Sequence, residues 1–280
     1  MAGDTPPIID WKVRMIRIVV CVKAVPDPKE ACKIKIDPVT KTLLRCEVPM
    51  VLNSLDRNAL EAALQVKAQQ EAHIVVLSMG PPEAGEIVKE CLALGADEGI
   101  LLSDRLFGGA DAFATARTLA KGIERIDNVD LVLCGMASSD GATEWVGPQI
   151  ATFLKAPVVT MVREFVSTGA EEWEVKAEYE NGYRRVRVKL PAVFTVTRDL
   201  NTPRTLSFSG IIKARKKTIA QWDLSGLDVP EALVGLKGSP TIVTAMGATD
   251  NQREVTFIEG TREEKADALV SRLAHAGLIG

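Results

Sequence analysis

The residues best suited to chemistry lie between Gly135 and Val146, in the stretch GMASSDGATEWV. They follow an apolar run from Asp130 to Cys134 that predicts a buried strand, and they precede a helical pattern that starts near Thr143. A glycine-containing turn between a strand and a helix presents backbone N–H groups that can hold a phosphate. The stretch matches neither standard glycine-rich phosphate motif. Taken alone, it slightly favours an ordinary loop with Thr143 as the helix N-cap.

The remaining reactive residue types give no sign of catalysis. The two histidines, His73 and His275, lie beside a predicted strand and near the end of a predicted helix, so neither suits a catalytic base. The five cysteines form no C-x-x-C pair, which argues against a zinc site or a disulfide framework and is typical of reduced thiols in the cytoplasm. We therefore predict no catalytic residue and no metal site, and any redox chemistry would come from a bound cofactor.

Length and composition indicate an ordinary globular protein. The chain has 280 residues, of which 46% are hydrophobic and 25% charged, so it can form one large domain or two small ones. A net charge of -3 gives no reason to expect a nucleic-acid partner. No apolar run is long enough for a transmembrane segment, and residues 1–15 read as a flexible extension without the apolar core of a signal peptide. We expect a cytoplasmic protein.

Strand and helix patterns alternate along the first half of the chain. Short apolar runs predict strands, and amphipathic segments between them predict helices. The expected strands are Ile16–Val22, Ile74–Leu77, Gly99–Leu102 and Leu131–Cys134, and the expected helices run from about Asn53 to Gln70, Glu83 to Leu94 and Asp111 to Arg125. This alternation predicts an α/β fold with a Rossmann-like, doubly wound, mainly parallel sheet.

Such a fold brings three polar loops to one place. The loops Lys23–Asp27, Ser78–Pro82 and Gly135–Val146 each follow a predicted strand, so all three lie at the carboxyl edge of the sheet. Ligands of doubly wound sheets bind at that edge, where the chain reverses direction. The shared position makes a nucleotide site a better interpretation of Gly135–Val146 than an ordinary loop.

The second half of the chain no longer shows the regular alternation of strand and helix patterns. Residues around Asn181-Gly182 alternate in a two-residue period, which predicts a β-hairpin, and a smaller hairpin is expected where 32–36 and 42–45 flank a turn. Ala192–Thr197 predicts another buried strand. We expect the nucleotide-binding domain to cover residues 16–217. Residues 218–280 would form an extended arm and a final helix, Arg262–Ala276, that docks on a partner subunit or packs on its own domain.

Six segments together resemble the small (beta) subunit of an electron-transfer flavoprotein. The resemblance covers the chain from about Arg17 to Ile279. The segments are IVVCVKAVPD (18–27), KIDPVTKTLLR (35–45), LNSLDRNALEAAL (52–64), LSMGPPEA (77–84), GMASSDGATEWVGP (135–148) and VKLPAVFTVT (188–197).

The resemblance implies a heterodimer with a larger alpha subunit that carries electrons between cofactors and other flavoproteins. In simple carriers the beta subunit binds AMP. In the electron-bifurcating branch it binds FAD, which accepts a hydride from NADH. The two electrons then go separately to a high-potential partner, such as an acyl-CoA dehydrogenase-type flavoprotein, and to a low-potential acceptor such as ferredoxin or flavodoxin.

Details of the segments favour the bifurcating branch and FAD over AMP. Residues 35–45, the helix start at 53–64 and parts of the Gly135–Pro148 loop resemble that branch. Ala142 replaces a usual Asp, Glu144-Trp145 replace Ala-Gln, and Ser54 replaces a Pro. An electron carrier with structural AMP remains one alternative, and a non-redox nucleotide-binding module is another. The resemblance leaves open whether the chain is part of an enzyme. It would be one if the flavin of the alpha–beta complex oxidises NADH.

The resemblance also implies which residues bind the cofactor. Cys21 and Lys23 would line the adenine end, while Met79 and the start of the first helix would flank the ribose and phosphates. The expected cofactor-binding residues are Cys21, Lys23, Asn53, Ser54, Leu55, Asp56, Met79, Gly135, Ser138, Ser139, Asp140, Gly141, Ala142, Thr143 and Val146. Helix capping is the alternative role for Asn53 and Asp56. Leu200 falls where the family carries the apolar anchor that docks dehydrogenases.

Overall fold

A computed structural model describes residues 15–33, 35–36, 43–44, 48–168, 171–244 and 255–279. The chain divides into two compact units, one ending at Thr244 and one spanning Ala245–Gly280. The helices are α1 (Ser54–Gln69), α2 (Gly85–Leu94), α3 (Ala112–Glu124), α4 (Val146–Leu154), α5 (Phe208–Ala214) and α6 (Arg262–His275). Short 3-10 turns are η1 (Pro28–Lys33), η3 (Pro82–Ala84), η4 (Arg105–Phe107), η5 (Arg198–Leu200), η6 (Leu224–Gly226) and η7 (Glu231–Leu233).

The first unit is built on one large sheet. Its strands are β1 (Ile16–Val22), β6 (Ala72–Met79), β7 (Glu98–Leu102), β8 (Leu131–Gly135), β9 (Val158–Thr168), β10 (Glu172–Tyr179), β11 (Gly182–Lys189), β12 (Ala192–Val196) and β13 (Ile219–Trp222). They are ordered β11-β10-β9-β12-β8-β1-β6-β7-β13. All neighbours are parallel except the antiparallel pairs β9–β10 and β10–β11. The predicted α/β class with a mainly parallel sheet is confirmed.

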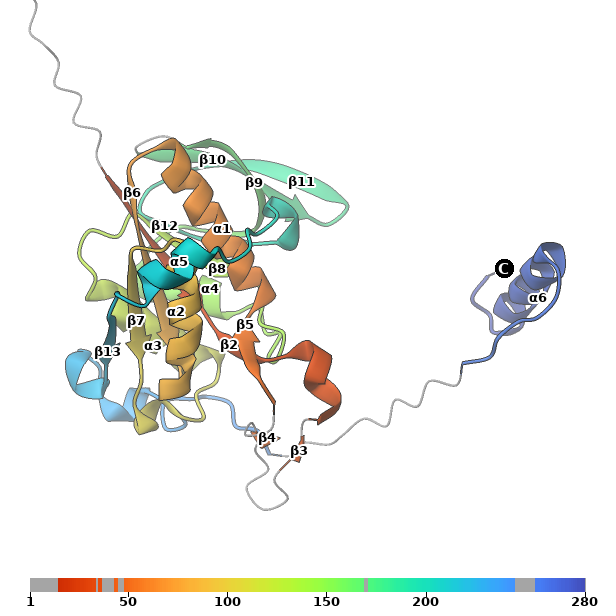
Figure 1. Ribbon diagram of the computed structural model, residues 1–280, viewed down its shortest axis with the longest axis horizontal. Coiled ribbons are helices and arrows are strands. Elements are labelled where there is room, and N and C mark those ends of the chain that lie inside the picture. The colour runs from red at the N-terminus through yellow and green to blue at the C-terminus, as the bar shows by residue number, and fades with distance from the viewer. Residues whose placement is uncertain are drawn as a thin grey trace, which may run out of the picture. The chain divides into compact units, whose positions relative to one another are not determined.

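Helices cover both faces of this sheet (Figure 1). The central strand β1 shows why: Ile18 and Val20 face a core shared with α1, α2 and α5, whereas Val19 and Cys21 face a second core shared with α3 and α4. A strand with apolar side chains on both faces can be stable only between two such layers. The continuous apolar run IRIVVCV therefore determines the layered architecture.

Two hairpins match their predictions. β10 pairs with β11 in an antiparallel ladder that ends with Tyr179 opposite Gly182, so the turn consists of Glu180 and Asn181, one residue before the predicted Asn181-Gly182. β3 (Lys35–Ile36) pairs with β4 (Leu43–Leu44), while the turn of that hairpin lies outside the described residues. A further small sheet joins β2 (Ala24–Pro26) to β5 (Met50–Leu52) and brings the chain from β1 to the start of α1.

The segment from residue 218 to residue 241 packs on the first unit and does not extend away from it as a free arm. β13 adds a parallel edge strand next to β7, and Leu227, Val229 and Val234 are buried in the core on the α3 and α4 side. The end of this segment is bound to the start of α3, because the Asp111 carboxylate accepts hydrogen bonds from the N–H and hydroxyl of Thr241. The segment from β13 to Thr241 thus packs on its own domain.

The second unit contains the predicted final helix, α6. Thr261 and Glu264 form a capping box at its start, in which each side chain bonds the other residue's backbone N–H. Leu269 and Val270 are exposed on this unit taken by itself. Docking of this helix on a partner subunit stays a prediction. Among the described residues, no helix has the length and apolar character needed to cross a bilayer.

Candidate functional site

The strand order places the candidate site at a reversal point of the sheet. From β1 the chain moves outward through β6 and β7, and then returns to place β8 on the opposite side of β1. Parallel strands end at the same edge, so Lys23 after β1, Met79 at the end of β6 and Gly135 at the end of β8 lie along one rim. The crevice outside such a reversal point is the usual ligand site of this architecture.

Asp56, in the first turn of α1, links the ends of β1 and β8. Its buried carboxylate accepts hydrogen bonds from the backbone N–H of Lys23 at 2.8 Å and of Gly135 at 3.0 Å. Burial raises the pKa of Asp56 to about 7, although these hydrogen bonds and the Lys23 ammonium favour the charged form. The carboxylate therefore holds the two strand ends in register beneath the loop.

Gly135 is required for this close approach. A Cβ atom at this position would lie 2.4 Å from Asp56 Oδ1 and 2.8 Å from the backbone carbon of Leu55. The start of α1 can therefore pack against the end of β8 only where the strand carries no side chain.

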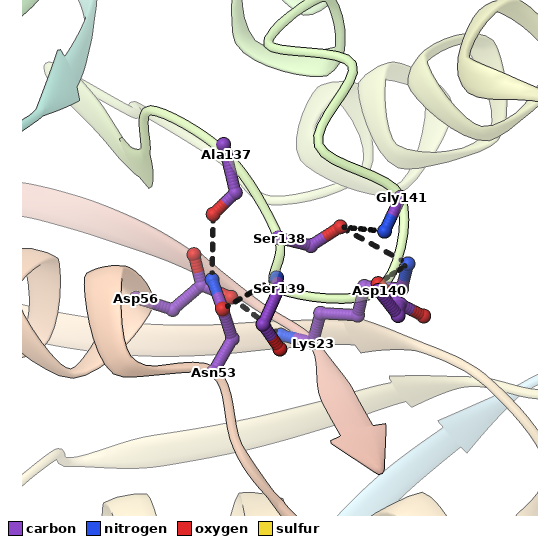
Figure 2. A network of polar contacts seen from close by, with 8 residues as sticks. All are labelled: Lys23, Asn53, Asp56, Ala137, Ser138, Ser139, Asp140 and Gly141. Atoms are coloured by element: carbon purple, nitrogen blue, oxygen red, sulfur yellow. Dashed lines mark hydrogen bonds and ion pairs between the residues drawn. The ribbon is translucent and has the colours of Figure 1, made fainter. Parts of the chain in front are cut away.

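Asn53 binds the loop rather than its own helix. It occupies the N-cap position of α1 but makes no side-chain capping bond. Instead its Nδ2 donates to the carbonyl of Ala137 at 2.9 Å, and its Oδ1 accepts from the backbone N–H of Ser139 at 3.2 Å (Figure 2). Both Asn53 and Asp56 thus use their polar atoms on the two strand-end loops, and the capping alternative is excluded for Asn53.

Lys23 places a cation over the same loop. Its ammonium lies 2.7 Å from Asp140 Oδ1 and 3.3 Å from Ser138 Oγ, and that hydroxyl also accepts from the N–H of Gly141 (Figure 2). The pKa of Asp140 lies below its usual range because Lys23 and Ser138 bond its carboxylate, which outweighs partial burial. Together Lys23 and the loop therefore place one cation, the Asp140 carboxylate paired with it and several small polar groups at the sheet edge.

The outer part of the loop is exposed and carries two unusual backbone conformations. Ala142 and Glu144 have φ angles of 47° and 60°, a left-handed region that costs a non-glycine residue roughly 1 to 2 kcal/mol. Trp145, 63% exposed, follows them, and α4 begins only at Val146. The predicted helix start near Thr143 is wrong, because the left-handed residues on both sides of Thr143 prevent a helical turn there.

The predicted site residues fall into two groups. One network unites Lys23, Asn53, Asp56, Ser138, Ser139, Asp140 and Gly141, with Gly135 at its base. The others lie around it: Ser54 and Leu55 start α1, Cys21 and Met79 sit near the ends of β1 and β6, and Ala142, Thr143 and Val146 continue the loop. The carbonyl of Ala137 is a member of the network that the sequence did not indicate.

Leu200 lies on a separate loop, in η5 after β12. Its side chain is half-buried against the core on the α1 side. Asn58 of α1 holds this loop by donating to the carbonyls of Arg198 and Asn201. A docking role for Leu200 stays a prediction.

A second contact from α1 fixes the same loop further along. The buried Glu61 carboxylate accepts from Arg204 Nε at 2.7 Å and Nη2 at 3.0 Å, and also from the Arg204 backbone N–H at 3.1 Å. Neither the Asn58 contacts nor the Glu61 contacts could be predicted from the sequence, because the partners are 140 to 143 positions apart.

Asp56 gives the site a pH dependence with a defined sign. A folded-state pKa of about 7 against an ordinary 3.8 means that this group favours folding fully below about pH 4 and loses that contribution as the pH rises through 7. Asp56→Asn does not titrate, but its amide nitrogen cannot accept a hydrogen bond, whereas the hydroxyl oxygen of the protonated acid can, so one N–H donor loses its partner at a cost of about 1 to 3 kcal/mol. Urea denaturation should show the variant less stable than the wild type at pH 5, with a smaller gap at pH 8.

Asp223→Asn is the matched control. The pKa of the exposed Asp223 carboxyl is lowered by hydrogen bonds from Ser225 and Gly226, so this group titrates only at acidic pH. The difference in free energy of unfolding between Asp223→Asn and the wild type should stay constant from pH 5 to pH 8. A constant gap for Asp56→Asn over the same range would contradict the raised pKa of Asp56.

Comparison with known proteins is consistent with this geometry. Residues 40–227 match the family described as "Electron transfer flavoprotein domain". The chain is 44% identical over 266 residues to the "Caffeyl-CoA reductase-Etf complex subunit CarD" of Acetobacterium woodii, covering 94% of this chain and 100% of that protein. It is 43% identical over 258 residues to an "Electron transfer flavoprotein subunit beta" of Clostridium acetobutylicum, covering 92% and 98%. The "Acryloyl-CoA reductase electron transfer subunit gamma" of Anaerotignum propionicum is 34% identical over 271 residues, covering 94% and 100%.

Proposed function

The chain belongs to the electron transfer flavoprotein family as a beta subunit, and from this premise we propose that its sheet-edge site binds FAD. Membership implies an alpha-subunit partner and further electron-transfer partners. The observation that carries the FAD proposal is the network around Asn53, Asp56 and Lys23, which organises the Gly135–Val146 loop at the reversal point of the sheet.

The residues present fit a nucleotide with a pyrophosphate. Lys23 supplies an ammonium group and Ser138 a hydroxyl group, two kinds of group that bind phosphates, and a phosphate would compete with Asp140 for the ammonium. A side chain at Gly141 would point toward the Lys23 ammonium, because a Cβ there would lie 3.9 Å from Nζ. The absence of that side chain keeps the cation accessible.

FAD bound here would supply the hydride-accepting and electron-transfer chemistry, and the chain's own residues would bind and orient it. The Lys23 ammonium offsets phosphate charge, and the buried Asp56 keeps the two loop-bearing strand ends together. We infer NADH as the electron donor and ferredoxin or flavodoxin as a low-potential acceptor from the resemblance to the bifurcating branch. The chain would work in the cytoplasm.

The names of two relatives support the class of high-potential partner. CarD is named for a caffeyl-CoA reductase–Etf complex, and the Anaerotignum protein for an acryloyl-CoA reductase. Both names refer to reductases of unsaturated CoA thioesters. We therefore propose that this chain serves a flavoprotein of the acyl-CoA dehydrogenase type.

Nucleotide extraction from the purified alpha–beta complex tests the proposal. We expect two FAD per heterodimer, no AMP, and reduction of flavin by NADH. One FAD with one AMP and no reaction with NADH would overturn it and identify a simple electron carrier. A beta chain that is colourless and monomeric, with no affinity for an alpha subunit, would instead identify a non-redox nucleotide-binding module.

A further inference from the structure

Two cysteines lie side by side beneath the candidate cofactor loop. Cys21 in β1 and Cys134 in β8 are direct partners in the parallel register of these neighbouring strands. Both side chains face the core on the α3 and α4 side, and both are free thiols with exposed fractions of only 7% and 5%. The pairing of β1 with β8 thus brings together two thiols that are 113 positions apart in the sequence.

The strand geometry allows a bond between the two sulfur atoms. Neighbouring strands lie about 4.8 Å apart, and disulfides form between Cα atoms separated by roughly 4.4 to 6.8 Å. Because the two residues are register partners on neighbouring strands, their side chains lie on the same face of the sheet. Each cysteine is also the second-to-last residue of its strand.

We propose that Cys21 and Cys134 form a dithiol that hydrogen peroxide closes to an intramolecular disulfide. In the first step one thiol, as its thiolate, attacks the peroxide O–O bond and becomes a sulfenic acid, and the departing oxygen leaves as water after protonation. In the second step the other sulfur attacks the sulfenic sulfur, the S–S bond forms and a second water leaves. Two thiols are oxidised by two electrons, and one peroxide is reduced.

Reduced thiols are the resting state of this pair. The neighbouring Cys21 thiol, followed by burial, raises the pKa of Cys134, so its thiol is protonated at neutral pH and reacts slowly. Closure would constrain the strand ends that carry Lys23 and Gly135, whose N–H groups both bond Asp56. The oxidation site therefore lies directly under the loop supports.

Cys91 provides an internal control. It is a free, fully buried thiol in α2, on the opposite face of the sheet, and burial raises its pKa as well. It resembles Cys134 in burial but lies in a different core, so oxidation that depends only on reagent access would not select the 21–134 pair.

Peptide mapping of the full chain in its alpha–beta complex tests the proposal, in a Cys32→Ser/Cys46→Ser background that removes the other two thiols. After hydrogen peroxide and alkylation, we expect a linked peptide pair containing residues 21 and 134, lighter by two hydrogen atoms and restored by dithiothreitol. Cys91→Ser should retain this product, and Cys134→Ser should lose it. Continued alkylation of both thiols, separate sulfinic acids, or a disulfide to Cys91 or to another chain would overturn the proposal. The test does not depend on which nucleotide is bound.

Discussion

Replacing Gly135 with alanine is expected to destabilise the protein by roughly 2.5 to 6 kcal/mol and to lower the occupancy of the nucleotide that we propose for this site. The added Cβ would meet Asp56 Oδ1 at 2.4 Å and the Leu55 backbone at 2.8 Å. Backbone atoms cannot move aside as a flexible side chain can, so α1 must shift. Overpacking of this kind costs about 1 to 3 kcal/mol, and loss of the bond between the Gly135 N–H and the buried carboxylate adds about 1.5 to 3 kcal/mol.

Urea denaturation and nucleotide content of the purified complex measure the two effects. Gly182→Ala is the matched control, because nothing lies within 4 Å of a Cβ at that hairpin position. It should change stability by less than about 0.5 kcal/mol. If Gly135→Ala equalled the wild type in both measurements, the tight contact between β8 and α1 would have no role in supporting the site.

Replacing Lys23 with methionine should reduce nucleotide binding strongly and change the free energy of unfolding only slightly. The Lys23 side chain is 44% exposed, and a partly exposed pair with Asp140 contributes at most about 1 kcal/mol to stability. A charged hydrogen bond to a phosphate contributes about 1.5 to 3 kcal/mol, so affinity for the beta-site nucleotide should fall about 10- to 100-fold. Equilibrium dialysis of the nucleotide against the complex measures this change.

Lys213→Met serves as the control, because Lys213 is an exposed lysine on α5, away from the Gly135–Val146 loop. It should leave both affinity and stability unchanged. Equal affinity of Lys23→Met and wild type would show that the nucleotide does not use this ammonium. A loss of stability as large as that of Gly135→Ala would show instead that Lys23 is a structural residue.

Much of the fold could be predicted because its signals are local. Apolar runs such as IRIVVCV identify buried strands without knowledge of their neighbours, and Asn181-Gly182 indicates the position of the hairpin turn to within one residue. β13 was missed for the converse reason. Its residues IAQW are only partly buried at the edge of the sheet, so no apolar pattern marks them, and only pairing with β7 makes them a strand.

The candidate site was predictable in position but not in its contacts. The order of strands and helices is sufficient to bring Lys23 and the Gly135–Val146 loop to one edge. The use of Asn53 on the loop rather than on the helix depends on where Ala137 and Ser139 lie in space. The left-handed conformations of Ala142 and Glu144, which delay α4, likewise follow from loop closure and not from residue type.

The polar residues of α1 have a consequence for how the domain opens. Asn53 and Asp56 hold the loop after β8, while Asn58 and Glu61, one to two turns further along, hold the loop after β12. Local unfolding of the first turns of this helix must therefore release both loops in a single event. The two loops are far apart in the sequence, but through α1 they form one cooperative unit of the native state.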